Sequence, residues 1–171
     1  MKKTINIRNK KDAITALQDF QEKQYTCDVR FTNVHLKELN TLVHLELFTK
    51  NDLFVEAGTL WDLMQPLGDE RLHHFHALTP TDIYETLRNI THPYCVLENS
   101  EGRIEILSSI ESHFGVPLIV VIELKSGLIV EDSANINKMV TMFPKRNADQ
   151  YISKFEIKKV FYLNKGNLKT K

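Results

Sequence analysis

The stretch that most constrains the fold is VPLIVVIEL, residues 116–124, which is apolar almost throughout. A run of this length between turn signals predicts a central β-strand that is covered on both faces. Alternating apolar patterns lie on either side of it. They predict a hairpin over residues 94–107, with Gly102 in its turn, and further strands over residues 137–143 and 158–163. The second half of the chain is therefore expected to form a sheet of about five strands.

The first half of the chain mixes helical and strand patterns. Ile14, Leu17 and Phe20 give one apolar face to a helix that starts near Asn9. Residues 27–34 alternate as in a strand. Shorter patterns predict strands over residues 4–8 and 53–56 and a helix over residues 58–65 before Pro66, whereas residues 35–48 fit either kind of element.

A strong helix start follows at residue 80. Thr79 is a good N-cap, Pro80 suits the first helical position, and Asp82 can complete a capping box. The fold class that we predict is α+β, with N-terminal helices followed by a mostly antiparallel sheet of about five strands. We expect residues 1–60 to be a helical and strand extension of unknown role, and residues 61–171 to be the main domain.

Composition and charge exclude several classes of protein. The 171 residues carry 22 basic and 22 acidic side chains, so any site for a polyanion must be local, and the last fifth of the chain is its most basic part. No apolar run approaches the length of a membrane span, and no signal-peptide pattern is present. Cys27 and Cys95 form no CxxC motif, which favours a reduced, cytoplasmic setting over a disulfide scaffold.

The sequence HHFHALTP, residues 73–80, places three histidines directly before that helix start. Their spacing lacks the i, i+4 pair of a helical zinc motif, so we expect no metal and no cofactor. Near a helix N-terminus the dipole disfavours the cationic imidazole, which keeps a neutral base available. His76 is the preferred acid–base group and His74 its alternate, with His73 as a substrate contact. The competing interpretation is that His74 or His76 is a hydrogen-bonded packing residue and that His73 is solvated.

Two further clusters could bind an anion. VTMFPKRN, residues 140–147, brings Thr141, Lys145 and Arg146 to the end of a strand, where the two cations could hold a phosphate. A solvated basic turn is the alternative for Lys145 and Arg146. In VFYLNKGN, the side chain of Tyr162 could stack on a base or donate to a phosphate, and Lys165 adds a positive charge. The alternative role of Tyr162 is that of a half-buried strand residue.

Other catalytic patterns are absent from the sequence. No Walker loop, GxGxxG or GxSxG motif occurs. Glu98, Glu101 and Glu105 surround the predicted hairpin turn and are expected to form a solvated face, which argues against a mechanism based on paired carboxylates.

Several motifs together resemble a known family. In order along the chain they are HxHxLTPxDI, THPYCVLENS, RIEILSSI, GxPLIVVIEL, INKMVTMFPK and VFYLNKG, and they span roughly residues 70–167. This order resembles the C-terminal domain of phage MuF-type head proteins and polyvalent proteins. That group is linked to the barnase–EndoU–colicin–RelE (BECR) class of RNases, so the resemblance implies a BECR-like RNase fold, with residues 61–171 as a barnase/RelE-like nuclease domain. Family strands often show Ser followed by Tyr where this chain has Thr141 and Phe143.

The resemblance implies a metal-independent endoribonuclease, a toxin or effector of a phage or mobile element. RNA would be cleaved by attack of the 2′-hydroxyl on its own phosphate. His76 would be the general acid or base, Thr141 would contact the phosphate or hydroxyl, and Lys145 and Lys165 would stabilise negative charge. Tyr162 would orient or stack the nucleotide. The expected partners are RNA and an immunity protein or antitoxin.

A second interpretation of the same resemblance is a catalytically inactive phage accessory domain. Such a domain would have the same shape and would bind RNA or a bacterial protein without cleaving anything. The two interpretations differ in whether incubation with RNA yields cleavage products in the presence of a chelator.

Overall fold

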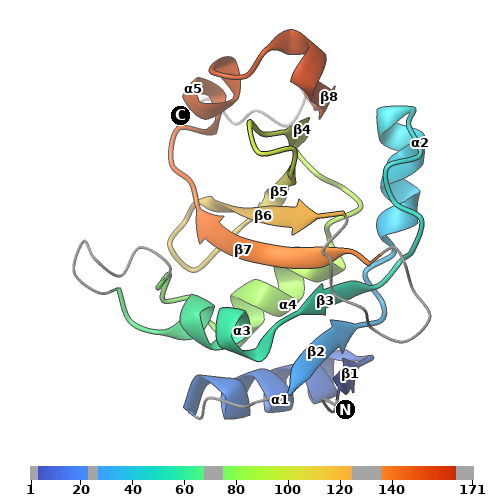
Figure 1. Cartoon of the computed structure of the whole chain (residues 1–171). Coiled ribbons are helices and arrows are strands. Elements are labelled where there is room, and N and C mark those ends of the chain that lie inside the picture. Colours follow the sequence, from blue (N-terminus) through green and yellow to red (C-terminus); the bar gives the residue numbers. More distant parts are fainter. Residues whose placement is uncertain (1–3, 23–26, 68–74, 125–135, 165–171) are drawn as a thin grey trace.

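The computed structural model describes residues 4–22, 27–67, 75–124 and 136–164, and these form one eight-stranded sheet with helices on both sides (Figure 1). The strand order is β1-β2-β3-β7-β6-β5-β4-β8. The strands are β1 (Thr4–Ile7), β2 (Asp28–Phe31), β3 (Leu53–Val55), β4 (Cys95–Glu98), β5 (Ile104–Glu111), β6 (Pro117–Glu123), β7 (Lys138–Pro144) and β8 (Val160–Leu163). The helices are α1 (Lys10–Glu22), α2 (Leu39–Val43), α3 (Ala57–Met64), α4 (Pro80–Arg88) and α5 (Ala148–Ser153), with 3₁₀ turns η1 (Leu36–Glu38) and η2 (Ile157–Lys159).

The predicted fold class is wrong in its details. We expected N-terminal helices before a mostly antiparallel, BECR-like sheet of about five strands, but the described residues form a single mixed sheet of eight. β1 pairs with β2 in parallel, and β3 pairs with β7 in parallel. The physical reason is that β1, β2 and β3 are each three or four residues long and cannot bury an apolar face alone, so they extend the sheet of the second half.

Strands from both sides of residue 60 therefore share one sheet, and residue 60 itself lies within α3. The division of the chain at that residue stays a prediction.

The central strand was predicted correctly. β6 lies between β5 and β7, and its residues from Leu118 to Ile122 are buried on both faces of the sheet. One face is covered by α1, α3 and α4, with Leu17, Leu60 and Ile83 among its fully buried side chains. The opposite face is covered in part by α5, whose Ile152 packs there against a smaller apolar cluster. We call this opposite side the α5 face.

The helix start at residue 80 is also confirmed. The Thr79 hydroxyl accepts a hydrogen bond from the Asp82 backbone N–H at 3.0 Å, and the Asp82 carboxylate accepts one from the Thr79 N–H at 3.0 Å. This capping box satisfies two backbone donors that a helix end leaves open.

One expectation about the hairpin is wrong. Glu105 does not belong to a solvated face, because it is only 4% exposed on the α5 face of β5. Its register places it opposite Val121 of β6, which itself lies opposite Thr141 of β7. A carboxylate and a hydroxyl are therefore in one row across the sheet.

Candidate functional site

His76 lies in a short segment that is tied to the end of α3. The backbone N–H of Ala77 donates to the Gln65 carbonyl at 2.8 Å, and that of Leu78 donates to the Leu63 carbonyl at 2.9 Å. Ala77 has φ of 51°, in the left-handed region that an alanine rarely occupies. Leu78 is fully buried. The backbone that directly follows His76 is thus held at the end of α3, at the cost of local strain at Ala77.

The structure brings His76 to Thr141, 65 residues further along the chain. The Nε2 atom of His76 lies 3.5 Å from the Thr141 hydroxyl oxygen, at the outer limit of a hydrogen bond. The ring of His76 lies 6.1 Å from the ring of Phe143, at an angle of 40°. The register between β3 and β7 pairs Phe54 with Lys138, near the start of β7. Thr141 and Phe143, which His76 contacts, lie in the C-terminal half of β7, beyond that pair.

Lys145 follows on the same side of the chain as Thr141 and Phe143. Its Nζ lies 4.8 Å above the ring of Tyr151 in α5, a cation–π contact, and its backbone N–H donates to the Pro117 carbonyl at 3.1 Å. Because side chains alternate along a strand, residues 141, 143 and 145 share the α5 face. Along this side of β7 and the residue after it, the Thr141 hydroxyl with the His76 imidazole beside it comes first. The Phe143 ring and the Lys145 ammonium group follow.

Two tyrosine hydroxyls fasten α5 and its start to the sheet. Tyr151 donates to the buried carboxylate of Glu105, and Tyr94 donates to Asp149 at 2.7 Å. Burial, together with the adjacent carboxylate, raises the pKa of both phenols well above the usual value. Burial and the charge of Glu105 likewise raise the pKa of the Cys95 thiol to about 12. All three groups are therefore protonated at neutral pH, and the two phenols act as hydrogen-bond donors.

The remaining predicted residues do not all join His76 and Thr141. Arg146 is exposed at the end of β7. Tyr162 is paired with Val96, whose side chain belongs to the core on the opposite side of the sheet from the α5 face. β8 is four strand positions from β7, which corresponds to about 19 Å across the sheet. His73, His74 and Lys165 lie outside the described residues.

The sequence did not predict one imidazole–carboxylate pair. Asp82, in the first turn of α4, accepts hydrogen bonds from both the backbone N–H of His113, at 2.8 Å, and its Nδ1. The Asp82 side chain is 6% exposed and that of His113 is 43% exposed. Burial acts to raise the pKa of Asp82, but the hydrogen bonds from Thr79 and His113 together lower it. The capping box is readable from the sequence, whereas a partner 31 residues away in the β5–β6 turn is not.

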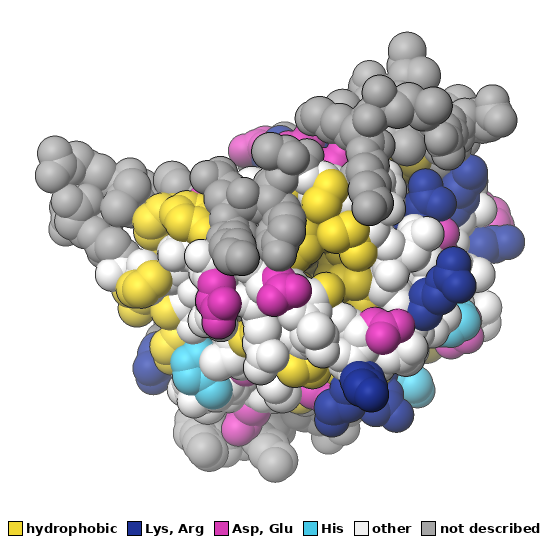
Figure 2. Space-filling view, turned by 90° about the horizontal axis from the view of Figure 1, so that it is seen from below, with side chains coloured by type: hydrophobic (Ala, Val, Ile, Leu, Met, Phe, Trp, Pro, Cys, Tyr) yellow, Lys and Arg dark blue, Asp and Glu magenta, His cyan; other side chains and the backbone are white. Residues whose placement is uncertain are grey.

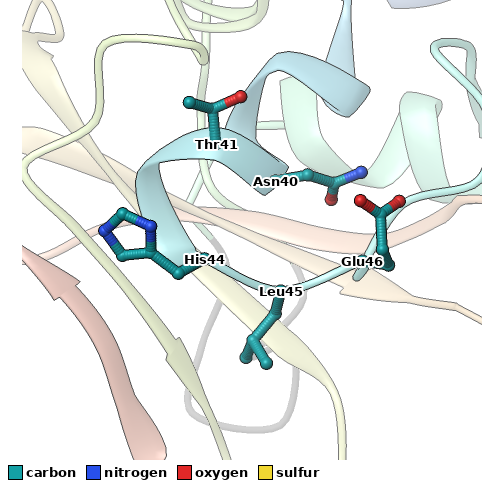
Figure 3. A pocket seen from close by; sticks show the side chains of 5 residues that line it. All are labelled: Asn40, Thr41, His44, Leu45 and Glu46. Carbon is teal, nitrogen blue, oxygen red and sulfur yellow. The ribbon is translucent and has the colours of Figure 1, made fainter.

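A small pocket lies elsewhere, at the end of α2. It has a volume of about 260 Å³ and is lined by Asn40, Thr41, His44, Leu45 and Glu46 (Figure 3). The Asn40 amide is already engaged, since it donates to the Phe48 carbonyl at 2.8 Å and accepts from the Phe48 N–H at 2.9 Å. None of the predicted site residues lines this pocket.

Charge is unevenly distributed over the surface. In the view from below, Lys and Arg side chains gather mainly along one side, while hydrophobic side chains are exposed in the middle and on the other side (Figure 2). Within the described ranges, no group of three or more His, Cys, Asp or Glu side chains could hold a metal ion. No helix in the described part of the chain is long and apolar enough to cross a membrane.

Comparison with known proteins adds no relatives. No family model matches the chain, and neither a curated protein nor a solved structure is significantly similar to it.

Proposed function

We propose that this protein is a metal-independent endoribonuclease in which His76 acts as the acid–base group. The observation that carries the proposal is the approach of His76 Nε2 to the Thr141 hydroxyl at 3.5 Å, because it joins two residues that are 65 positions apart in the chain. Both residues were expected at the site from the sequence. Lys145 lies on the same side of β7 and supplies a positive charge for RNA.

The chemistry needs few groups from the protein. A neutral imidazole at His76 takes the proton of a ribose 2′-hydroxyl, whose oxygen then forms a bond to the adjacent phosphorus. The bond from phosphorus to the 5′-oxygen breaks, and that oxygen leaves with a proton from solvent. The products are a 2′,3′-cyclic phosphate and a free 5′-hydroxyl. The Thr141 hydroxyl would hold a phosphate oxygen or the attacking hydroxyl beside His76.

The setting and partners of the protein belong to the same proposal. An endoribonuclease of a phage or mobile element would act in the cytoplasm, where its RNA substrate is, and an immunity protein or antitoxin would protect the cell that makes it. The free thiols of Cys27 and Cys95 suit a reducing compartment.

The test compares two histidine variants on cellular RNA in the presence of EDTA. His76→Ala is expected to lower the cleavage rate by about 10²- to 10⁴-fold, the usual contribution of a general acid or base. His92→Ala is the matched control, because His92 is exposed in the turn that follows α4 and its ring nitrogen contacts only the Thr91 hydroxyl among the described residues. Both variants should melt close to the temperature of the wild type.

Two results would contradict the proposal. Cleavage by His76→Ala at the wild-type rate would exclude this residue as the catalyst. Retention of RNA on a filter by the wild type, without any cleavage products, would instead support the second interpretation, a binding domain that has no activity.

A further inference from the structure

We propose that single-stranded RNA lies along the second half of β7, with one base stacked on Phe143 and a flanking phosphate on Lys145. The inference deepens the proposed function, on which it rests for the nature of the ligand, by naming the form of RNA and the residue that selects it.

The spacing along β7 suits alternating phosphates and bases. Residues 141, 143 and 145 are separated by two strand positions each. Along the strand, the Cα atoms of neighbouring members are therefore about 6.7 Å apart, and those of residues 141 and 145 are about 13 Å apart. A phosphate held beside His76 and Thr141 therefore leaves Lys145 too far along the strand to contact the same phosphate group closely. Lys145 is placed instead for the next phosphate, and Phe143 lies between the two.

Phe143 has the surroundings of a stacking residue. Phe143 is only partly buried, it packs against the apolar cluster of the α5 face, and the ring of His76 lies 6.1 Å from its ring. A phenylalanine offers a base an aromatic face but no hydrogen bond. Stacking on such a ring tolerates any base, so it supplies affinity without sequence preference.

The charges near Lys145 suit a phosphate. Among the described residues, neither Lys145 nor the adjacent Arg146 forms an ion pair, whereas Lys138, Lys158 and Lys159 do, with Glu56, Glu156 and Glu98 respectively. The ammonium group of Lys145 is fixed by the ring of Tyr151, and that ring is fixed in turn by Glu105. A positioned cation without a carboxylate partner remains available to a ligand anion.

The form of RNA follows from the same geometry. In a duplex the bases are stacked within the helix and their faces are covered, so a ring on a sheet surface cannot reach them. A single strand can present a base to Phe143 while its phosphates lie at Thr141 and Lys145. The ligand is therefore single-stranded RNA.

Binding is measured by fluorescence anisotropy with a labelled 2′-O-methyl octanucleotide, which cannot be cleaved, and with a hairpin duplex of the same composition. Phe143→Leu keeps an apolar side chain in the cluster but removes the ring. It should weaken binding of the single strand by about 5- to 150-fold, the loss expected for one stacked base. Phe143→Tyr, which keeps the ring, should bind within about two-fold of the wild type. Phe114→Leu is the matched control at the β5–β6 turn, where Phe114 is also partly buried.

Lys145→Gln provides a second measurement. The slope of log affinity against log salt concentration should fall by about 0.7, the value for one phosphate contact on a single strand. The inference is overturned if Phe143→Leu binds like the wild type, or if the duplex binds as tightly as the single strand. A wild type that binds the single strand as described but cleaves no RNA would refute the proposed catalysis and leave the inference standing.

Discussion

The Asp82–His113 pair gives the sharpest prediction about stability. Asp82→Ala removes three acceptor contacts at once: those to the Thr79 N–H, the His113 N–H and the His113 ring. Hydrogen bonds to a charged group contribute about 1.5–3 kcal/mol each, but the three do not add in full, because His113 is 43% exposed and water can replace part of the loss. We expect a loss of about 3 kcal/mol in the free energy of unfolding, or about 6–12 °C in Tm for a chain of this size.

The pH dependence of this loss has a definite sign. The folded-state pKa of Asp82 lies below its ordinary value of 3.8, so its contribution to stability is fully present above that value. The contribution disappears as the pH falls through the lowered pKa, because the Asp82 carboxyl group of the wild type is then protonated and uncharged, like the side chain of Asp82→Asn. The difference between the wild type and Asp82→Asn should therefore shrink as the pH falls below 3.8.

Urea denaturation followed by circular dichroism measures both effects. Asp19→Asn is the matched control, since Asp19 is exposed on α1 and should change stability by less than about 0.5 kcal/mol. The reasoning is refuted if Asp82→Ala unfolds within about 0.5 kcal/mol of the wild type. It is also refuted if the difference for Asp82→Asn is the same in acid as at neutral pH.

Two further predictions concern strain and thiol burial. Ala77→Gly should raise the free energy of unfolding by about 0.5–1 kcal/mol, because relief of the left-handed conformation outweighs the added freedom of the unfolded chain. Ala16→Gly, within α1, should lower it by a similar amount. Thermal melting shows the sign of each change, and a destabilised Ala77→Gly would contradict the strain at Ala77. Cys95 is buried and has a thiol pKa of about 12, so it should not react with Ellman's reagent until the protein unfolds. Cys27 is partly exposed and should react in the native protein. Rapid labelling of both thiols in the native protein would contradict the packing of β4.

Local features of the sequence were sufficient for the elements with strong patterns. The apolar run of residues 116–124 predicted β6, and Thr79, Pro80 and Asp82 predicted the start of α4, because both signals depend on residues that are close together in the chain. The sheet order was not predictable in this way. The parallel pairing of β3 with β7 joins Phe54 to Lys138, and no local pattern in either strand specifies the other.

The arrangement of the candidate site was predictable only in part for the same reason. His76 and Thr141 were both singled out from the sequence, and the structure places them in contact. Tyr162 was grouped with them because its strand ends in a basic segment, but a strand pattern cannot tell which edge of a sheet the strand occupies or which face each side chain takes. Glu105 was misjudged because its charge suggested solvent, whereas Tyr151 and Asn99 satisfy its carboxylate within the fold.

The most direct test of the proposed activity uses one RNA oligonucleotide in two forms. The all-ribose strand is incubated with the wild type in EDTA, its cleavage position is mapped, and a second strand is made with a single 2′-deoxy nucleotide on the 5′ side of that position. We predict a 2′,3′-cyclic phosphate product from the first strand and no cleavage at the substituted position of the second. With His76→Ala, cleavage of the first strand should be about 10²- to 10⁴-fold slower. Cleavage at the 2′-deoxy position, or an intact all-ribose strand, would contradict the account.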